Sequence, residues 1–186
     1  MEALHDLVKA GKVRYLGSSA MYTWQFAKAQ FMVEKHDWTT FVSMQNHLNL
    51  LYREEEREMI PFCEDQKIAI TPYSPLASGR LTRDWTGDTK RSLTDQTSKM
   101  KYDQTMDQDR VIVERVAQVA EELDGKRAQV ALAWLMQTEV VTVPIIGATK
   151  ESHLLDALPA IDVTLTPEQV AFLEEPYLPH QVVGAR

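Results

Sequence analysis

Apolar residues along the chain follow two spacings, one typical of strands and one typical of helices. Short apolar runs predict strands at residues 13–17, 41–45, 68–71 and 140–147. Apolar residues three and four positions apart predict helices between and after these strands. The helices are marked by Leu4, Leu7 and Val8; by residues 24–35; by residues 54–66; by Ile112, Val116, Val119 and Leu123; by Val130, Ala131, Trp134 and Leu135; by Leu154, Leu155 and Leu158; and by a last helix starting at Thr166.

The alternation of strand and helix predicts an α/β fold with a parallel sheet and helical crossovers. The last strand, 140–147, is apolar throughout, which is typical of a parallel strand covered on both faces. In such folds the functional residues lie at the C-terminal ends of the strands. We therefore search residues 17–22, 45–49, 71–80 and 146–153 for chemistry.

Prolines and apolar spacing constrain individual helices. Pro61 should kink the helix at 54–66 or confine its regular part to later residues. Pro167 suits the first helical position of the last helix, with Thr166 as N-cap and Gln169 completing a capping box. In the helix at 24–35, the side chains predicted to face a core are Trp24, Ala27, Phe31 and Val33.

Residues 82–109 interrupt this rhythm. They are rich in Thr, Ser, Asp, Gln and Lys and show no sustained apolar period. We therefore predict a long loop over 82–109. A loop of this length is uncommon unless it is functional or disordered.

Composition narrows the class of protein. With 44% hydrophobic and 25% charged residues, the chain is typical of a soluble globular domain. Its net charge of −7 makes a broad nucleic-acid surface unexpected, and no apolar run approaches the roughly 18 residues of a membrane helix. A single cysteine, Cys63, allows no internal disulfide and is interpreted as an inert packed thiol. We expect a cytoplasmic protein with neither nucleic acid nor membrane as a partner.

Polar, small and aromatic residues follow the predicted strands. Ser18, Ser19, Gln45 and Asn46 offer hydroxyls and carboxamides. In the segment 73–80, a flat ring can stack on Tyr73, and a phosphate can take Ser78, backbone amides and Arg80. Lys150 precedes a helix whose N-terminal dipole favours an anion. Together these positions favour a nucleotide-like ligand.

Each of these residues also has a purely structural interpretation. Tyr73 is equally well explained as a packed aromatic side chain. Lys150 can be a solvated cation, and Gln45 can simply cap a strand. The five histidines show no spacing typical of metal ligands with Cys, Asp or Glu, so we predict no metal site.

The order of motifs resembles the aldo-keto reductase family over essentially the whole chain. The motifs that carry the resemblance are GKVRYLGSS (11–19), QNHLNLL (45–51), IAITPYSPLASGRL (68–81), ALAWLMQ (131–137), VPIIGATKESHL (143–154) and LTPEQVAFLE (165–174). The ending YLPHQVVGAR (177–186) is similar to the bacterial branch named after a deoxyxylulose-phosphate-synthase-like reductase.

The resemblance implies a nicotinamide cofactor and its binding residues. Ser19 and Gln45 match residues that hydrogen-bond the nicotinamide carboxamide, and Tyr73 matches the aromatic that stacks on the ring. The pyrophosphate segment is matched by Ser74, Leu76, Ser78 and Arg80; the loop for the adenosine 2′-phosphate by Gly147, Thr149 and Lys150; and the adenine end by His153 and Asp156. This pattern implies NADP(H) rather than NAD(H).

Two residues depart from the family pattern in this part. Ala20 stands where many members have Asn or Arg beside the nicotinamide. Ala157 stands where many have an Asn that hydrogen-bonds adenine. Both departures are expected to weaken cofactor affinity.

The chain is also short for the implied fold, because a (β/α)8 barrel typically needs about 250 residues. Its 186 residues resemble strands five to eight alone, so we predict a single partial barrel, the C-terminal half of an aldo-keto reductase domain, over 1–186. The family's Asp, Tyr, Lys and His tetrad has no matching position here, and we assign no catalytic residue. An open half-barrel exposes sheet edges and apolar surface, which predicts self-association.

These inferences support two functional interpretations. The first is the cofactor-binding half of an NADP-dependent oxidoreductase acting on aldehydes or ketones, with a carbonyl substrate only when an N-terminal half completes it. The alternative is a non-catalytic nucleotide-binding or subunit-interaction protein of the same fold. The sequence does not specify the substrate.

Overall fold

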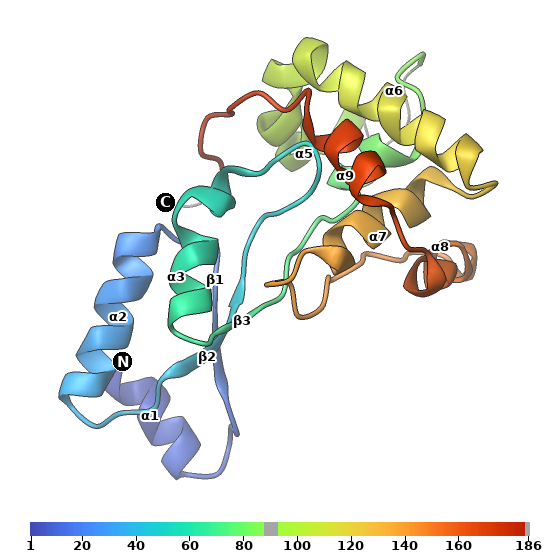
Figure 1. The fold of residues 1–186 in the computed structure, drawn as a ribbon. Coiled ribbons are helices and arrows are strands. Elements are labelled where there is room, and N and C mark those ends of the chain that lie inside the picture. The colour runs from blue at the N-terminus through green and yellow to red at the C-terminus, as the bar shows by residue number, and fades with distance from the viewer. Residues whose placement is uncertain (88–92, 185–186) are drawn as a thin grey trace.

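The structure, a computed structural model, describes residues 1–87 and 93–184 and has an α/β fold. Its sheet contains β1 (Leu16–Ser19), β2 (Phe41–Gln45) and β3 (Ala69–Ile70), in the order β1-β2-β3. Both pairings are parallel, with Ser19 beside Gln45 and Met44 beside Ile70. Figure 1 shows the helices α1, α2 and α3 beside these strands and α5 to α9 gathered at the other end of the molecule. The three predicted strands at 13–17, 41–45 and 68–71 are confirmed, within a few residues.

Close approach of β1 and β2 explains the glycine in the first strand. A Cβ added at Gly17 would lie 2.5 Å from Oγ of Ser43 on the neighbouring strand. Real Cβ atoms do not approach other atoms so closely, so a larger residue would require the Ser43 hydroxyl to move, whereas the Ser43 carbonyl at 3.6 Å leaves ordinary contact distance. Glycine in a strand often marks such a contact.

The fourth predicted strand, 140–147, is not a regular strand. Its backbone meets β3 and the following residues in isolated parallel bridges, Val141 with Ile70 and Ile145 with Tyr73. The side chains of Val143 and Ile145 are 52% and 42% exposed, so the prediction that both faces are covered is wrong. One side of the segment is covered, since Val141 is buried and Ile146 packs against Leu132, Ala157 and Ala160, and apolar character alone could not show which side that is.

Helix α1 (Glu2–Lys9) precedes β1, and α2 (Thr23–Lys35) follows it. The predicted inward face of α2 is largely wrong. Trp24 and Phe31 are 63% and 55% exposed, whereas Phe26 is fully buried. The buried residues of this helix are Phe26, Gln30 and Val33, so only Val33 was predicted correctly.

A polar residue explains why the face was misjudged. Gln30 is buried, and its side chain accepts a hydrogen bond from the backbone N–H of Phe41 (2.9 Å) and donates one to the Phe41 carbonyl (3.0 Å). A buried carboxamide with both partners satisfied carries little penalty. The helix therefore turns Gln30 and Phe26 toward β2, while the more apolar Phe31 faces outward.

The segment after β2 contains a short 3₁₀ helix, η1 (Glu54–Arg57), and then α3 (Met59–Asp65). Pro61 lies in the first turn of α3, where its missing N–H costs no hydrogen bond. The prediction that proline confines the regular helix to later residues is confirmed. Cys63 on α3 is fully buried, and burial raises the pKa of its thiol to about 12, so the thiol stays protonated.

The prediction of a long loop over 82–109 is wrong for its second half. Residues 88–92 lie outside the described residues, and α5 (Gln96–Tyr102), η3 (Asp103–Thr105) and the first turn of α6 occupy most of the remainder. The side chain of Asp95 caps α5 by accepting a hydrogen bond from the Ser98 backbone N–H (2.9 Å). Helix α5 is short and mostly polar, so it has no apolar period; it is fixed by buried Tyr102 instead.

The remaining helices agree with the predicted positions. They are α6 (Met106–Glu122), α7 (Arg127–Gln137), α8 (Glu151–Ala157) and α9 (Pro167–Glu174), with 3₁₀ turns η2 (Ala77–Thr82) and η4 (Leu158–Asp162). The capping box is confirmed, because Oγ1 of Thr166 accepts from the Gln169 N–H (3.2 Å) and the Gln169 side chain accepts from the Thr166 N–H (3.1 Å).

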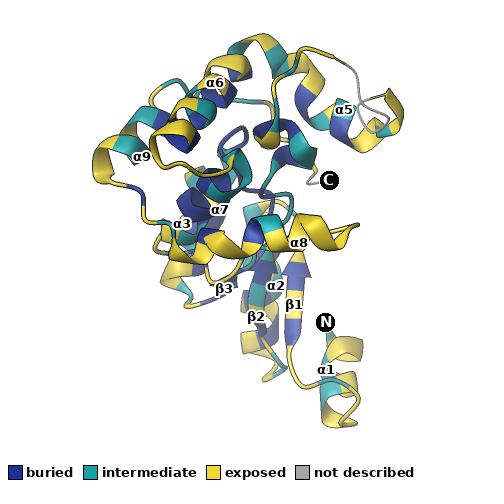
Figure 2. Cartoon of the chain, turned by 90° about the vertical axis from the view of Figure 1, so that its right-hand side faces the viewer, coloured by how far each residue is buried: buried dark blue, intermediate teal, exposed yellow. Residues whose placement is uncertain are grey.

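Burial differs sharply between these helices, as Figure 2 shows for α8. The apolar residues predicted for α6 and α7 are buried, including Val116 and Trp134, except Leu123, which follows the end of α6 and is 38% exposed. The leucines of the next helix, by contrast, are exposed: Leu154 by 44% and Leu155 by 58%. In the described part of the chain, no helix has both the length and the apolar character needed to cross a membrane.

Candidate functional site

A cleft of about 770 Å³ lies beyond the C-terminal end of β3. One wall is the loop and 3₁₀ turn that follow β3, from Tyr73 to Thr82. The opposite walls come from α6, from the start of α7, and from the backbone between Ile145 and the end of α8. The cleft therefore lies where parallel α/β sheets place their ligands.

Seven of the twelve residues predicted to bind a ligand line this cleft. They are Tyr73, Ser74, Leu76, Ser78, Gly147, His153 and Asp156. The other five, Ser19, Gln45, Arg80, Thr149 and Lys150, are not among the lining residues. The structure thus brings together residues that are up to 83 positions apart in sequence, from Tyr73 to Asp156.

Ser19 and Gln45 lie side by side at the ends of β1 and β2. The Ser19 hydroxyl donates a hydrogen bond to the Gln45 carbonyl oxygen (3.0 Å), and the Ala20 N–H donates to the same oxygen (3.1 Å). Ala20 has a φ of 43°, which is unusual for a residue with a Cβ. The adjacency of these strand ends is confirmed, and it leaves the Gln45 side chain partly accessible.

Tyr73 lies between neighbours from two other segments. Its N–H donates to the Asn46 carbonyl (2.9 Å), and its ring stacks on His47 with centroids 5.1 Å apart and planes inclined by 9°. Nζ of Lys101 on α5 donates to the Tyr73 hydroxyl (2.9 Å) and lies 4.3 Å from the ring centroid. Burial is the main cause that raises the pKa of Tyr73, and Glu55 adds to it.

Arg80 is enclosed by protein. Its guanidinium forms an ion pair with Asp103, and it lies 5.6 Å from the ring centroids of both Trp85 and Tyr102. The residue is only 7% exposed, so in this structure it joins η2 to η3 and does not face the cleft. Thr149 and Lys150 are exposed at the start of α8, where Lys150 is the N-cap.

The basic groups that do line the cleft were missed by the sequence analysis. They are Lys126 and Arg127 at the start of α7. Lys126 forms an ion pair with Asp156, and Arg127 forms one with Asp84 (2.7 Å). The sequence did contain a signal for an anion site, since two adjacent basic residues follow Gly125 at the start of a helix. The sequence analysis considered only the apolar residues of that helix.

The loop after β3 carries unusual backbone conformations. Ser74, Ala77, Ser78 and Gly79 have φ values of 56°, 47°, 58° and 88°. Residues other than glycine adopt such angles at a cost and do so most often at functional sites. Four left-handed residues within six positions on one wall of a cleft mark this loop as a candidate ligand-binding element.

A buried polar cluster supports the same loop from behind. His47 is 2% exposed, its Nε2 is 2.8 Å from the Tyr102 hydroxyl, and its ring stacks on Tyr52 with centroids 4.3 Å apart. Asn49 donates to the Ser74 carbonyl (3.0 Å) and to the Tyr102 hydroxyl (3.1 Å). Burial, followed by the charges of Lys101 and His180, lowers the pKa of His47 to about 3, so its imidazole is neutral.

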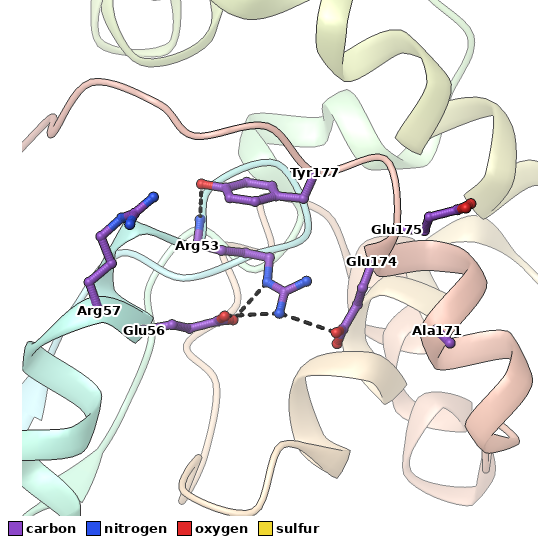
Figure 3. Close-up of a pocket in the computed structure, with 7 residues that line it drawn as sticks. All are labelled: Arg53, Glu56, Arg57, Ala171, Glu174, Glu175 and Tyr177. Atoms are coloured by element: carbon purple, nitrogen blue, oxygen red, sulfur yellow. Dashed lines mark hydrogen bonds and ion pairs between the residues drawn. The ribbon is translucent and has the colours of Figure 1, made fainter.

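A second hollow, of about 550 Å³, lies between η1 and α9 (Figure 3). Arg53 crosses it, donating twice to Glu56 (2.8 and 2.9 Å) and pairing with Glu174 (3.2 Å). The guanidinium also lies 5.5 Å from the ring centroids of Trp134 and Tyr177. The charge of Arg53 is thus balanced by Glu56 and Glu174, and we interpret this hollow as a structural contact between η1 and α9.

Comparison with known proteins decides the family. The model described as the aldo/keto reductase family matches residues 1–177 of this chain. The chain belongs to the aldo/keto reductase family. The family generally uses nicotinamide cofactors.

Relatives of this chain include several fungal proteins. An aldo-keto reductase of Fusarium vanettenii is 44% identical over 99% of this chain and 50% of its own length. An aldo-keto reductase of Metarhizium robertsii is 43% identical over 99% of this chain and 50% of its own. The versiconal hemiacetal acetate reductase of Aspergillus parasiticus is 40% identical over 98% of this chain and 53% of its own.

The chain spans about half the length of these relatives. Membership of the family confirms the resemblance seen in the motifs. The finer assignments, to the C-terminal half and to the bacterial branch, stay predictions.

Proposed function

We propose that the cleft beyond β3 binds NADP(H), and that these 186 residues supply the cofactor-binding half of an aldo/keto reductase. The observation that carries the proposal is the convergence of seven predicted cofactor residues on one cleft. The fit of the group is supported by the chemistry of the walls: an aromatic ring, hydroxyls, left-handed backbone and basic side chains.

Each part of the dinucleotide has candidate partners. Tyr73 offers an aromatic ring for the nicotinamide, near the Gln45 and Ser19 strand ends. Ser74, Leu76 and Ser78 line the middle of the cleft, on the left-handed loop. At the far end, Gly147, His153 and Asp156 lie on the same side of the cleft as Lys126, which pairs with Asp156, and Thr149 and Lys150 are exposed at the start of α8. Arg80 would reach a phosphate only by leaving Asp103.

The bound cofactor supplies a hydride, and the protein must supply the proton. Hydride addition to an aldehyde or ketone leaves an alkoxide, which a positioned acid protonates as it forms. In this proposal the family's proton-relay tetrad lies outside these 186 residues, so we assign the present residues to binding and orientation. In this proposal they form strands five to eight of a barrel, and turnover requires the complementary half.

Cofactor binding is tested by titrating the purified chain with NADPH and NADH while following tryptophan and tyrosine fluorescence. We expect saturable quenching, with NADPH bound about tenfold more tightly because its 2′-phosphate meets the Lys150 ammonium at the start of α8. Lys150→Met should remove most of that preference. Lys9→Met, on α1, is the matched control and should retain it.

The same samples test incompleteness. With an aromatic aldehyde added, the NADPH absorbance at its characteristic wavelength should stay constant. Turnover at an ordinary enzyme rate would show that the chain holds its own proton donor, and equal affinities for NADPH and NADH would refute the proposed 2′-phosphate site.

Exposed apolar residues support the alternative in which the chain associates with itself or another subunit. Strand β1 pairs only with β2 among the described residues, and Trp24, Phe31 and Ile161 are 63%, 55% and 71% exposed. We expect the isolated chain to sediment as a dimer or larger species at micromolar concentration. Trp24→Ser combined with Phe31→Ser should shift it toward monomer, whereas a wild-type chain that sediments as a monomer would contradict the proposal.

A further inference from the structure

Lys101 occupies the position over the Tyr73 ring. Its ammonium lies 4.3 Å from the ring centroid and donates to the ring hydroxyl at 2.9 Å. The His47 imidazole stacks on the same ring. The aromatic group proposed to receive a nicotinamide is therefore already in contact with a cation that the chain itself provides.

Lys101 is in no direct ion pair with a carboxylate among the described residues. Its polar partner is the neutral Tyr73 hydroxyl. Burial lowers the pKa of Lys101, and this effect is larger than that of the negative charge of Asp95, which raises it. The stem of Lys101 comes from α5, whose position is fixed by buried Tyr102 and by the ion pair of Asp103 with Arg80. A ligand that stacks on Tyr73 can therefore displace the Lys101 ammonium from the ring, but the charge stays close to the bound ligand.

Resting on the proposed NADP(H) site, we propose that Lys101 is a specificity-determining residue that makes the site favour the reduced cofactor over the oxidised one. The two forms differ in charge at the ring. Oxidised nicotinamide is a pyridinium with one positive charge, whereas the reduced dihydropyridine is neutral. Both rings must displace Lys101 from Tyr73, but only the oxidised ring is then repelled by it.

Two further features of the site fit this role. The cation–π attraction that would favour a pyridinium on Tyr73 is already satisfied by Lys101. Lys101 is also half-buried, which weakens the screening of its charge by solvent. Lys101 is not itself among the residues that line the cleft and contacts the site through Tyr73, whereas Lys126 lines the adenosine end, so the effect of Lys101 should be confined to the nicotinamide end.

The test compares dissociation constants of NADP⁺, NADPH and 2′-phospho-ADP-ribose for the wild-type chain, Lys101→Met and Lys101→Arg. In Lys101→Met the preference for NADPH over NADP⁺ should fall about fivefold, the effect of one unit charge at about 4 Å in a high dielectric. Lys101→Arg keeps the charge and should keep the wild-type preference. Because 2′-phospho-ADP-ribose lacks the nicotinamide, it should bind with the same affinity to all three proteins.

Different failures have different meanings. If the preference is unchanged in Lys101→Met while the wild type binds both dinucleotides, this inference is wrong and the proposed function stands. An equal change for all three ligands would make Lys101 merely structural. Absence of any binding by the wild type and both variants would overturn the proposed function and this inference together. Should Lys101→Met not fold, as judged by its thermal transition, Lys101→Gln repeats the measurement with a polar neutral side chain.

Discussion

Replacing Phe26 by alanine is expected to lower the free energy of unfolding by about 3–5 kcal/mol. Phe26 is fully buried between α2, β2 and α3. Its ring centroid lies 5.7 Å from that of Phe41 and 5.8 Å from that of Phe62, so truncation removes two aromatic contacts as well as apolar burial. Little nearby structure can collapse into the space, because Gln30 is fixed to the Phe41 backbone.

The matched control is Phe31→Ala on the same helix. Phe31 is 55% exposed, and its truncation should cost well under about 1 kcal/mol. Both variants are measured by urea denaturation over a range of protein concentrations, so that the contribution of self-association, in which exposed Phe31 is proposed to take part, is separated from that of folding. Equal losses, or a larger loss for Phe31→Ala, would show that α2 presents the face expected from sequence and not the face in this structure.

Burial of His47 is expected to make the free energy of unfolding fall on acidification, and this fall should be visible only when the opposing contribution of Glu55 is removed. In the unfolded chain an imidazole has a pKa near 6.5, whereas the buried His47 has a pKa of about 3. The stabilising contribution of the neutral imidazole is therefore present above about pH 6.5 and is lost as the pH falls toward 3. Linkage makes this loss about 2 kcal/mol between pH 7 and pH 5.

Glu55 acts in the opposite direction over the same range. Burial raises the pKa of its carboxyl to about 7, above the unfolded value of about 4.3. Its charged form destabilises the fold at neutral pH, and that penalty is relieved as the pH falls from 7 toward 4.3. The two contributions nearly cancel, so the wild-type free energy of unfolding should change little between pH 7 and pH 5.

Variants separate the two groups. Glu55→Gln should lose about 2 kcal/mol of stability between pH 7 and pH 5, and His47→Gln should gain a similar amount. His36→Gln removes an exposed imidazole and should follow the wild-type profile. Urea denaturation at half-unit pH steps supplies the measurement. Parallel pH profiles for wild type, Glu55→Gln and His47→Gln would show that neither buried group titrates as proposed.

Local sequence rules predicted much of the fold because the interactions they describe are local. The capping box at Thr166 and Gln169 forms between residues three positions apart. Pro61 acts on its own turn of helix, and the strand-to-helix alternation follows from apolar spacing. These features need no knowledge of what the segment packs against.

The candidate site was predicted in part for the same reason. Parallel strand ends must meet at one edge, so the segments 45–49 and 71–80 were both searched for site residues, and the structure joins them by a bridge between His47 and Tyr73. The sequence did not show that Arg80 pairs with Asp103, because that ion pair crosses a segment interpreted as a loop. Lys126 was likewise missed, since its position on the cleft depends on how α7 approaches α8.

The amino-acid sequence by itself determined the family, the first three strands and most of the helices in their order. Only the tertiary structure decided which face of α2 is buried, that α5 exists, and that Lys101 lies over Tyr73. The physical reason is the same in each case. A helical period defines a helix but not its partner, and polar groups such as Gln30 and Lys101 take positions set by hydrogen bonds to residues distant in sequence.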